Sequence, residues 1–325
     1  MRTKDRLILN PVCITEVRFG LRFRRIILAV KIFYCNNKIM EIIRVNTNRG
    51  LELKGAMWGD ASMDAVVVMM SGICSNVFQN DLLPAAAELL CKNNIAFIAG
   101  HAMDAFSCLA YTDFSTGKQK NTGVVFDDFS VVYEDVESYV KYARELGFKK
   151  IILAGHSLGS NKIINYLGNT SDDFVDYFIV SAPVDLTHWF DVMPNVKECL
   201  ELAQKFVDAG RGKDILPFMF GGFSPMCAET ALNFYNAYNL KNCPVISGDG
   251  ETVSLANIKP HGAFVIGSKD SLTNGDAKGF MEKINSYTKH PAANEAIVVP
   301  DASHIFYGKH EEYAKVILEV VKGVL

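Results

Sequence analysis

The chain has 325 residues, of which 49% are hydrophobic and 21% charged, and its formal net charge at pH 7 is −3. This composition is ordinary for a globular protein and allows a large buried core. Acidic and basic residues are mixed, without the basic excess of a phosphate-binding surface, so we expect no nucleic-acid partner. The eight cysteines form no C-x-x-C pair, and several lie in apolar segments, which favours reduced thiols and a cytoplasmic protein.

Near the N-terminus, Arg24 and Arg25 precede an apolar run, Ile26–Tyr34, that Lys31 interrupts. This run is much shorter than the stretch of about 18 apolar residues that indicates a membrane-spanning helix. No small-residue cleavage site follows it. We therefore expect no membrane span and treat residues 1–38 as an N-terminal extension, with a signal or an interfacial anchor as the alternative.

From Met40 onward, the pattern of apolar residues predicts alternating strands and helices. Continuous apolar runs rich in valine and isoleucine are typical of parallel strands that are buried on both faces. Apolar residues at helical spacing lie between these runs. The predicted strands are Glu41–Val45, Leu51–Gly55, Ala65–Met70, Ile95–Ala99, Lys150–Ala154, Phe178–Ser181, Ala263–Ile266 and Ala296–Val299. The predicted core helices are Leu82–Asn93, Phe129–Leu146, Asn161–Leu167, Ala277–Tyr287 and Glu311–Val321.

The regular alternation stops between Pro183 and Pro244. Within this segment the spacing predicts an amphipathic helix at Val196–Ala209. Ser224 and Pro225 resemble the start of a second helix that would run to Tyr238. We therefore predict an α/β core formed by residues 39–183 and 245–325, with residues 184–244 inserted as a helical cap.

The sequence Gly155-His156-Ser157-Leu158-Gly159 lies directly between a predicted strand and a predicted helix. A nucleophilic serine needs a sharp turn of this kind, and the flanking glycines let neighbouring backbone approach without Cβ clashes. Ser157 is therefore the candidate nucleophile.

A serine hydroxyl is a weak nucleophile and requires a base, which in turn requires a group that orients it. His304 follows the last predicted strand and is the candidate base. Asp270 follows the preceding strand and is the candidate acid, in the chain order Ser, Asp, His. Asp249, Asp276 and Asp301 are the alternative candidates for the acid, but for each the simpler interpretation is an exposed carboxylate in a turn or loop. The six other histidines, at 101, 156, 188, 261, 290 and 310, do not combine a position at the end of a strand with the chain order Ser, Asp, His.

An oxyanion intermediate needs two backbone N–H donors. Leu158, directly after the candidate nucleophile, supplies one. The second is predicted in the loop after the strand Ala65–Met70, where the Ile73 amide is the candidate and Cys74 is one residue away.

These motifs resemble the α/β-hydrolase superfamily over roughly Met40 to Leu325, most closely its esterase-like and acyl-peptidase-like members. The resemblance implies an eight-stranded, mostly parallel sheet flanked by helices, often with an inserted helical cap. One departure is that Ser71-Gly72 replaces the usual His-Gly of the oxyanion loop, which leaves the donor geometry open.

The resulting hypothesis is a serine hydrolase that acts on a small-molecule acyl substrate, most simply a carboxylic ester. We expect no cofactor and no metal, because the sequence has no zinc, P-loop or dinucleotide motif. The alternatives are a thioesterase or peptidase with the same triad, or a non-catalytic ligand-binding protein with this fold.

Overall fold

The structure, a computed structural model, describes residues 34–35, 38–171, 173–222, 224–236, 242–247 and 253–325. Most of the predicted N-terminal extension lies outside the described residues, including all of the apolar run Ile26–Tyr34 except Tyr34. In the part of the chain that the structure describes, no helix combines the length and apolar character needed to cross a membrane.

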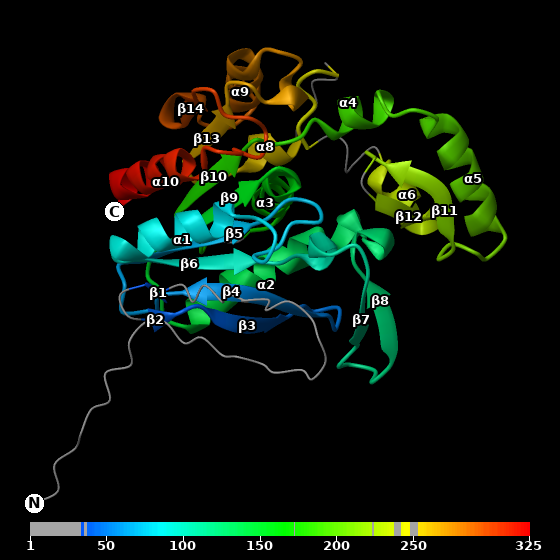
Figure 1. Cartoon of the computed structure of the whole chain (residues 1–325), viewed down its shortest axis with the longest axis horizontal. Coiled ribbons are helices and arrows are strands. Elements are labelled where there is room, and N and C mark those ends of the chain that lie inside the picture. The colour runs from blue at the N-terminus through cyan, green and yellow to red at the C-terminus, as the bar shows by residue number, and fades with distance from the viewer. Residues whose placement is uncertain (1–33, 36–37, 172, 223, 237–241, 248–252) are drawn as a thin grey trace, which may run out of the picture.

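An eight-stranded sheet forms the centre of the molecule (Figure 1). Six of its strands are parallel, and β4 and β3 join the sheet antiparallel at one edge. In spatial order the strands are β14 (Glu295–Val299), β13 (Gly262–Gly267), β10 (Tyr177–Ser181), β9 (Ile151–His156), β5 (Ala65–Met70), β6 (Ile95–Gly100), β4 (Glu52–Trp58) and β3 (Glu41–Asn46). The central strands are buried along their whole length, as continuous apolar runs predict. The α/β-hydrolase fold predicted from the sequence is thus confirmed.

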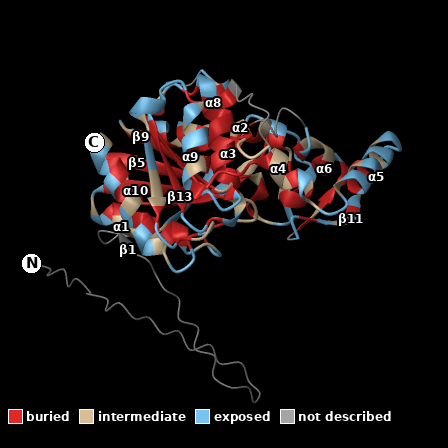
Figure 2. Cartoon of the chain, turned by 90° about the horizontal axis from the view of Figure 1, so that it is seen from above, coloured by how far each residue is buried: buried red, intermediate tan, exposed pale blue. Residues whose placement is uncertain are grey.

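Helices cover both faces of this sheet, which lies between them in the view of Figure 2. On one face α1 (Leu82–Lys92) packs against α10 (His310–Val324). On the other, α3 (Leu158–Asn169) packs against α2 (Val132–Glu145) and α8 (Val253–Asn257). The helix α9 (Ala277–Ser286) packs on β13 and β14. The helices α1, α2, α9 and α10 each carry a stripe of apolar residues that the sheet buries, whereas α3 is buried on all sides.

A smaller group of elements lies to one side of the sheet (Figure 1) and has its own apolar cluster. It contains α4 (Leu186–Asp191), α5 (Val196–Asp208), β11 (Ile215–Phe220), β12 (Ser224–Cys227) and α6 (Ala228–Phe234). The helix predicted to start at Ser224 is therefore wrong in its first turn. Residues 224–227 pair with β11 instead, in a two-stranded sheet whose edge tolerates the missing N–H of Pro225.

The sequence also gave no indication of the hairpin β7 (Leu109–Thr112) and β8 (Gln119–Thr122). Its residues are mostly exposed, so burial imposes no regular alternation on them. A two-residue pairing, β1 (Tyr34–Cys35) with β2 (Lys38–Ile39), precedes the main sheet.

Candidate active site

The parallel register brings the ends of four strands to one edge of the sheet. Met70 of β5 pairs with Gly155 of β9, and farther along the sheet Gly267 of β13 pairs with Val299 of β14. Each predicted site residue follows one of these strands. Side chains that are distant in sequence therefore converge at the carboxyl edge, where ligands bind in open α/β sheets.

Ser157, His304 and Asp270 form a continuous series of hydrogen bonds. The Ser157 Oγ and His304 Nε2 atoms are 2.9 Å apart, and the His304 Nδ1 and Asp270 Oδ2 atoms are also 2.9 Å apart. An ionised carboxylate can only accept, so His304 donates through Nδ1 and is left with Nε2 as an acceptor for the serine hydroxyl. This arrangement allows the imidazole to take the serine proton.

Asp270 is held in place on both sides of its carboxyl group. Its side chain is 1% exposed, and its Oδ1 atom accepts a hydrogen bond of 2.9 Å from the Leu272 N–H. The other oxygen is thereby directed to His304, whose side chain is 16% exposed. The Asp270 carboxylate thus fixes the orientation of the His304 ring, and part of that ring remains accessible to solvent.

Ser157 has the strained backbone of a sharp strand-to-helix turn, with φ +55° and ψ −129°. The turn is tight enough that a Cβ on Gly159 would lie 2.1 Å from the Met70 carbonyl oxygen, and one on Gly155 would lie 2.5 Å from the Gly159 oxygen. Glycine is therefore required at both positions of the motif.

The two predicted oxyanion donors, Ile73 and Leu158, line the same pocket as Ser157. Leu158 begins α3, so its N–H has no carbonyl partner within the helix. A Cβ on Gly72 would lie 2.9 Å from the Ser157 Cβ, which places the loop after β5 directly against the serine. The Cys74 N–H donates to the Asp104 carbonyl at 2.9 Å, whereas the Ile73 N–H has no hydrogen-bond partner among the described residues. Of the two amides that the sequence left open, that of Ile73 is therefore the one without a partner among the residues that the structure describes.

A pocket of about 310 Å³ opens onto Ser157 and His304. Its wall is largely apolar, and its aromatic residues Trp189 and Phe234 come from residues 184–244. The other lining residues are Ile73, Cys74, Leu158, Val184, Leu186, Leu272 and Ile305. This volume lies at the small end of the range for small-molecule sites.

Residues 128–325 match the model of a family described as Protein of unknown function (DUF1749). This chain belongs to the DUF1749 family. The matched region contains Ser157, Asp270 and His304 but begins after the loop that follows β5, so it does not include Ile73. No curated protein matches the sequence.

Solved structures with the same fold resemble this DUF1749 chain over most of its length. Est1E from Butyrivibrio proteoclasticus is 12% identical, with a TM-score of 0.55 over 87% of this chain and 98% of Est1E. The α/β hydrolase GrgF from Penicillium sp. sh18 is 17% identical, with a TM-score of 0.63 over 87% and 98% of the two chains. A putative aryl esterase from Burkholderia cenocepacia is 14% identical, with a TM-score of 0.52 over 87% and 99%. At these identities the likeness concerns the fold.

Two of the three alternative candidates for the acid in the DUF1749 chain are engaged elsewhere. Asp276 caps α9 by accepting the Gly279 N–H at 2.8 Å. Asp301 is exposed and pairs with Lys269 at 2.7 Å. Asp249 lies outside the described residues. Among the residues that are described, no three His, Cys, Asp or Glu side chains gather as a metal site would require.

His156, which was not chosen as the candidate base, supports His304 through a second contact, made to the backbone of His304. Its Nε2 atom lies 2.9 Å from the His304 carbonyl oxygen, so the ring must donate there. Its Nδ1 atom is buried with no partner in the described part of the chain. Burial, together with the nearby His304, lowers the pKa of His156 to about 4, which keeps the ring neutral at pH 7.

This pKa predicts a specific dependence of stability on pH. An unfolded histidine has a pKa of about 6.5, so between pH 6.5 and about 4 the unfolded chain binds a proton that the folded chain excludes. The free energy of unfolding should therefore fall by about 3 kcal/mol through this window on account of His156 alone. We expect His156→Gln to lose less stability than wild type between pH 7 and pH 4 in urea unfolding.

The exposed His290 provides the control, since His290→Gln should follow the wild-type curve. A His156→Gln curve parallel to that of wild type would contradict a buried neutral ring.

A buried ion pair supports the loop that carries Ile73. Lys162 of α3 pairs with Asp104, and both side chains are at most 1% exposed. Burial raises the pKa of Asp104. The nearby carboxyl of Asp127 has its pKa raised well above the usual range, first by burial and then by the charge of Asp104, which favours the neutral form of Asp127. The pair thus links the helix after Ser157 to the segment whose carbonyl holds Cys74. Sequence reasoning missed it, although a lysine next to Ile163 and Ile164 was the available signal.

Proposed function

We propose that this protein is a serine hydrolase that cleaves a carboxylic ester through an acyl-enzyme intermediate. The observation that carries the proposal is the hydrogen-bonded series Ser157, His304, Asp270 at the carboxyl edge of the sheet. The names of several neighbours with this fold, such as the esterase domain from Rhodothermus marinus at 13% identity, agree with ester chemistry.

In the proposed mechanism, the Ser157 Oγ attacks the ester carbonyl while His304 Nε2 takes its proton. Asp270 holds the ring in the required tautomer and stabilises the imidazolium that forms. The free N–H groups of Ile73 and Leu158 would bind the oxyanion, and they need no reorganisation because the backbone holds them in place. His304 then returns the proton to the leaving alcohol, and water deacylates Ser157 by the same route.

The substrate class follows from the pocket. Its wall offers apolar contacts, with Trp189 and Phe234 as the largest side chains, and none of its lining residues is Asp, Glu, Lys or Arg. An uncharged acyl group of modest size fits such a wall better than an anionic one. We propose that the segment 184–244 acts as the cap that determines this specificity.

The chemistry is tested with matched ester, thioester and amide substrates that share one short apolar acyl group. The proposal predicts the highest kcat/KM for the ester. A higher value for the thioester or the amide would assign the same residues to a thioesterase or a peptidase. Saturable binding of all three compounds without turnover would instead indicate a non-catalytic ligand-binding protein.

Trp189→Ala tests the assigned pocket in the same assay. We expect it to raise KM for the longest acyl group accepted while leaving the value for an acetyl ester nearly unchanged, because a short acyl group does not reach the removed ring.

A further inference from the structure

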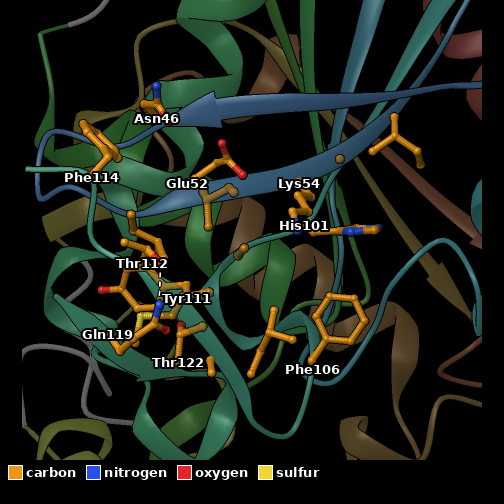
Figure 3. A pocket seen from close by; sticks show the side chains of 18 of the residues that line it. Asn46, Glu52, Lys54, His101, Phe106, Tyr111, Thr112, Phe114, Gln119 and Thr122 are labelled. Carbon is orange, nitrogen blue, oxygen red and sulfur yellow. Dashed lines mark hydrogen bonds between the residues drawn. The ribbon is translucent and has the colours of Figure 1, made fainter. Parts of the chain in front are cut away.

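Two of the hollows outside the pocket of Ser157 differ in their relation to it. The larger, of about 830 Å³, lies beside the β7–β8 hairpin (Figure 3) and shares no lining residue with that pocket. The smaller, of about 130 Å³, shares Val184, Trp189 and Leu272 with it. The smaller hollow, which we call the side pocket, therefore adjoins the proposed reaction centre. Its other lining residues are Asp185, His188, Val192, Ser271 and Asn274.

The order of the strands places the side pocket on one particular side of Ser157. Its walls come from the loops after β10 and β13 and from α4. In the sheet, β9, which precedes Ser157, lies between these strands and β5, which precedes the proposed donor Ile73. The oxyanion therefore lies toward β5, whereas His304, which follows β14, approaches Ser157 from the opposite side. The side pocket is on the side of the base.

This side is where the alcohol part of an ester must lie. In the proposed reaction, the bond between the acyl carbon and the alcohol oxygen breaks as His304 Nε2 gives its proton to that oxygen, and a neutral alcohol leaves. The alcohol oxygen must then be next to His304, on the same side of Ser157 as the side pocket. The alcohol is thus the part of the substrate that reaches the side pocket.

The side pocket presents polar side chains, whereas the wall of the pocket of Ser157 is mostly apolar. The His188 ring, the Ser271 hydroxyl and the Asn274 amide line it. None of these three side chains forms a hydrogen bond with another residue that the structure describes. A few polar groups with unused hydrogen-bonding capacity are what orients a ligand in a small-molecule site.

Hydrogen bonds hold the elements that carry these polar groups in place. The buried Asp185 carboxylate accepts the N–H groups of His188 and Ile246, at 3.0 and 2.6 Å. In the loop after β13, the Asp270 carbonyl accepts the Thr273 hydroxyl at 2.8 Å. The walls of the side pocket are therefore fixed by contacts within the protein.

Charge and size narrow the class of alcohol. No lysine or arginine lines the side pocket, and its one acidic residue, Asp185, disfavours an anion. Asp185 is 2% exposed, and both of its oxygens accept backbone N–H groups, which satisfies the carboxylate without a bound cation. A volume of about 130 Å³ holds about four waters at about 30 Å³ each, which matches a small molecule rich in hydroxyl groups.

We propose that the side pocket binds the alcohol part of the substrate, and that this alcohol is a small neutral polyol such as glycerol. Its hydroxyl groups bond the side chains of His188, Ser271 and Asn274, while the acyl group occupies the apolar pocket of Ser157. This inference rests on the proposed ester hydrolysis and adds the class of alcohol to it.

The test measures kcat/KM for two butanoate esters that differ only in the polarity of the alcohol. 1-Butanoylglycerol carries hydroxyl groups where 2-methylbutyl butanoate carries methyl groups. Wild type should prefer the glycerol ester, and the ratio of the two values measures this preference. His188→Phe, Ser271→Ala and Asn274→Gly should each lower the ratio by about threefold or more, because each removes one hydrogen bond to the polyol. A change in the reactivity of Ser157 affects both esters and cancels in the ratio.

Matched variants separate lost binding from structural damage. His290→Phe makes the same exchange at an exposed histidine that lines neither pocket, and it should leave the ratio unchanged. Asn274 has a left-handed backbone, with φ +53°, which glycine adopts without strain. Ser271→Ala removes an exposed hydroxyl, so its melting temperature should not fall.

A ratio that all three side-pocket variants leave unchanged would overturn the assignment of the side pocket, while the proposed hydrolysis would stand. A higher kcat/KM for choline butanoate than for 1-butanoylglycerol would also overturn it, because the pocket would then favour a cation. If wild type hydrolysed none of these esters, the proposed function would fail and this inference with it.

Discussion

Replacing Ser157 by alanine is expected to reduce kcat for an activated ester by about 10⁴-fold or more, the scale seen when a nucleophile is removed from a triad that acts as a unit. The acyl-enzyme cannot form without the Oγ atom, and only binding and the two amide donors remain to promote direct attack by water. His304→Ala should cause a loss of similar size, because the Ser157 hydroxyl then has no base within 2.9 Å. Steady-state kinetics on one ester measures both.

Asp270→Asn refines the prediction. The amide of asparagine can donate to Nδ1 and hold His304 in the wrong tautomer, so kcat should fall by about 10⁴-fold even though the geometry is kept. Ser303→Ala, which changes a serine next to His304 that takes no part in the series, should retain wild-type activity. If the Ser157, His304 and Asp270 variants all hydrolysed the ester at the wild-type rate, the proposed mechanism would be wrong.

The second large effect concerns stability. Lys162→Met leaves the Asp104 carboxyl buried without its cation, and breaking a buried pair from one side costs about 3–5 kcal/mol of folding free energy. Urea unfolding measures this loss. We also expect lower activity, because Asp104 holds the Cys74 amide next to the proposed donor Ile73.

A double variant distinguishes the lost pairing from lost packing. Lys162→Met combined with Asp104→Leu replaces both charges by apolar groups and should recover most of the stability, since such exchanges are close to neutral. Lys259→Met, which breaks the exposed pair with Asp173, should cost at most about 1 kcal/mol. If Lys162→Met were no less stable than Lys259→Met, the buried pair would have no structural role.

Most of the sheet could be predicted from the sequence because its central strands are buried on both faces and therefore appear as unbroken apolar runs. The same burial explains why the ends of β9 and β13 indicated where Ser157 and Asp270 would lie, whereas the partly exposed β14 before His304 was indicated by the apolar run Ala296–Val299 alone. Parallel strands bring their carboxyl ends to one edge, so the order of these residues along the chain was sufficient.

Long-range contacts of single polar groups could not be predicted in this way. The choice between Ile73 and Cys74 depends on the Asp104 carbonyl, and the partner of Lys162 is 58 positions away in the sequence. The β7–β8 hairpin and the cavity beside it also left no pattern, because exposed strands need no alternation. Strand β12 was mistaken for a helix start because Ser-Pro fits both a first helical turn and the edge of a small sheet.

The central claim is that Ser157 is an activated nucleophile. It is tested most directly by labelling the purified protein with a fluorophosphonate probe and identifying the modified peptide by mass spectrometry. We predict a single adduct on Ser157 that is absent from Ser157→Ala and strongly reduced in His304→Ala. An adduct on another residue, or none at all on wild-type protein shown to be folded, would contradict the account.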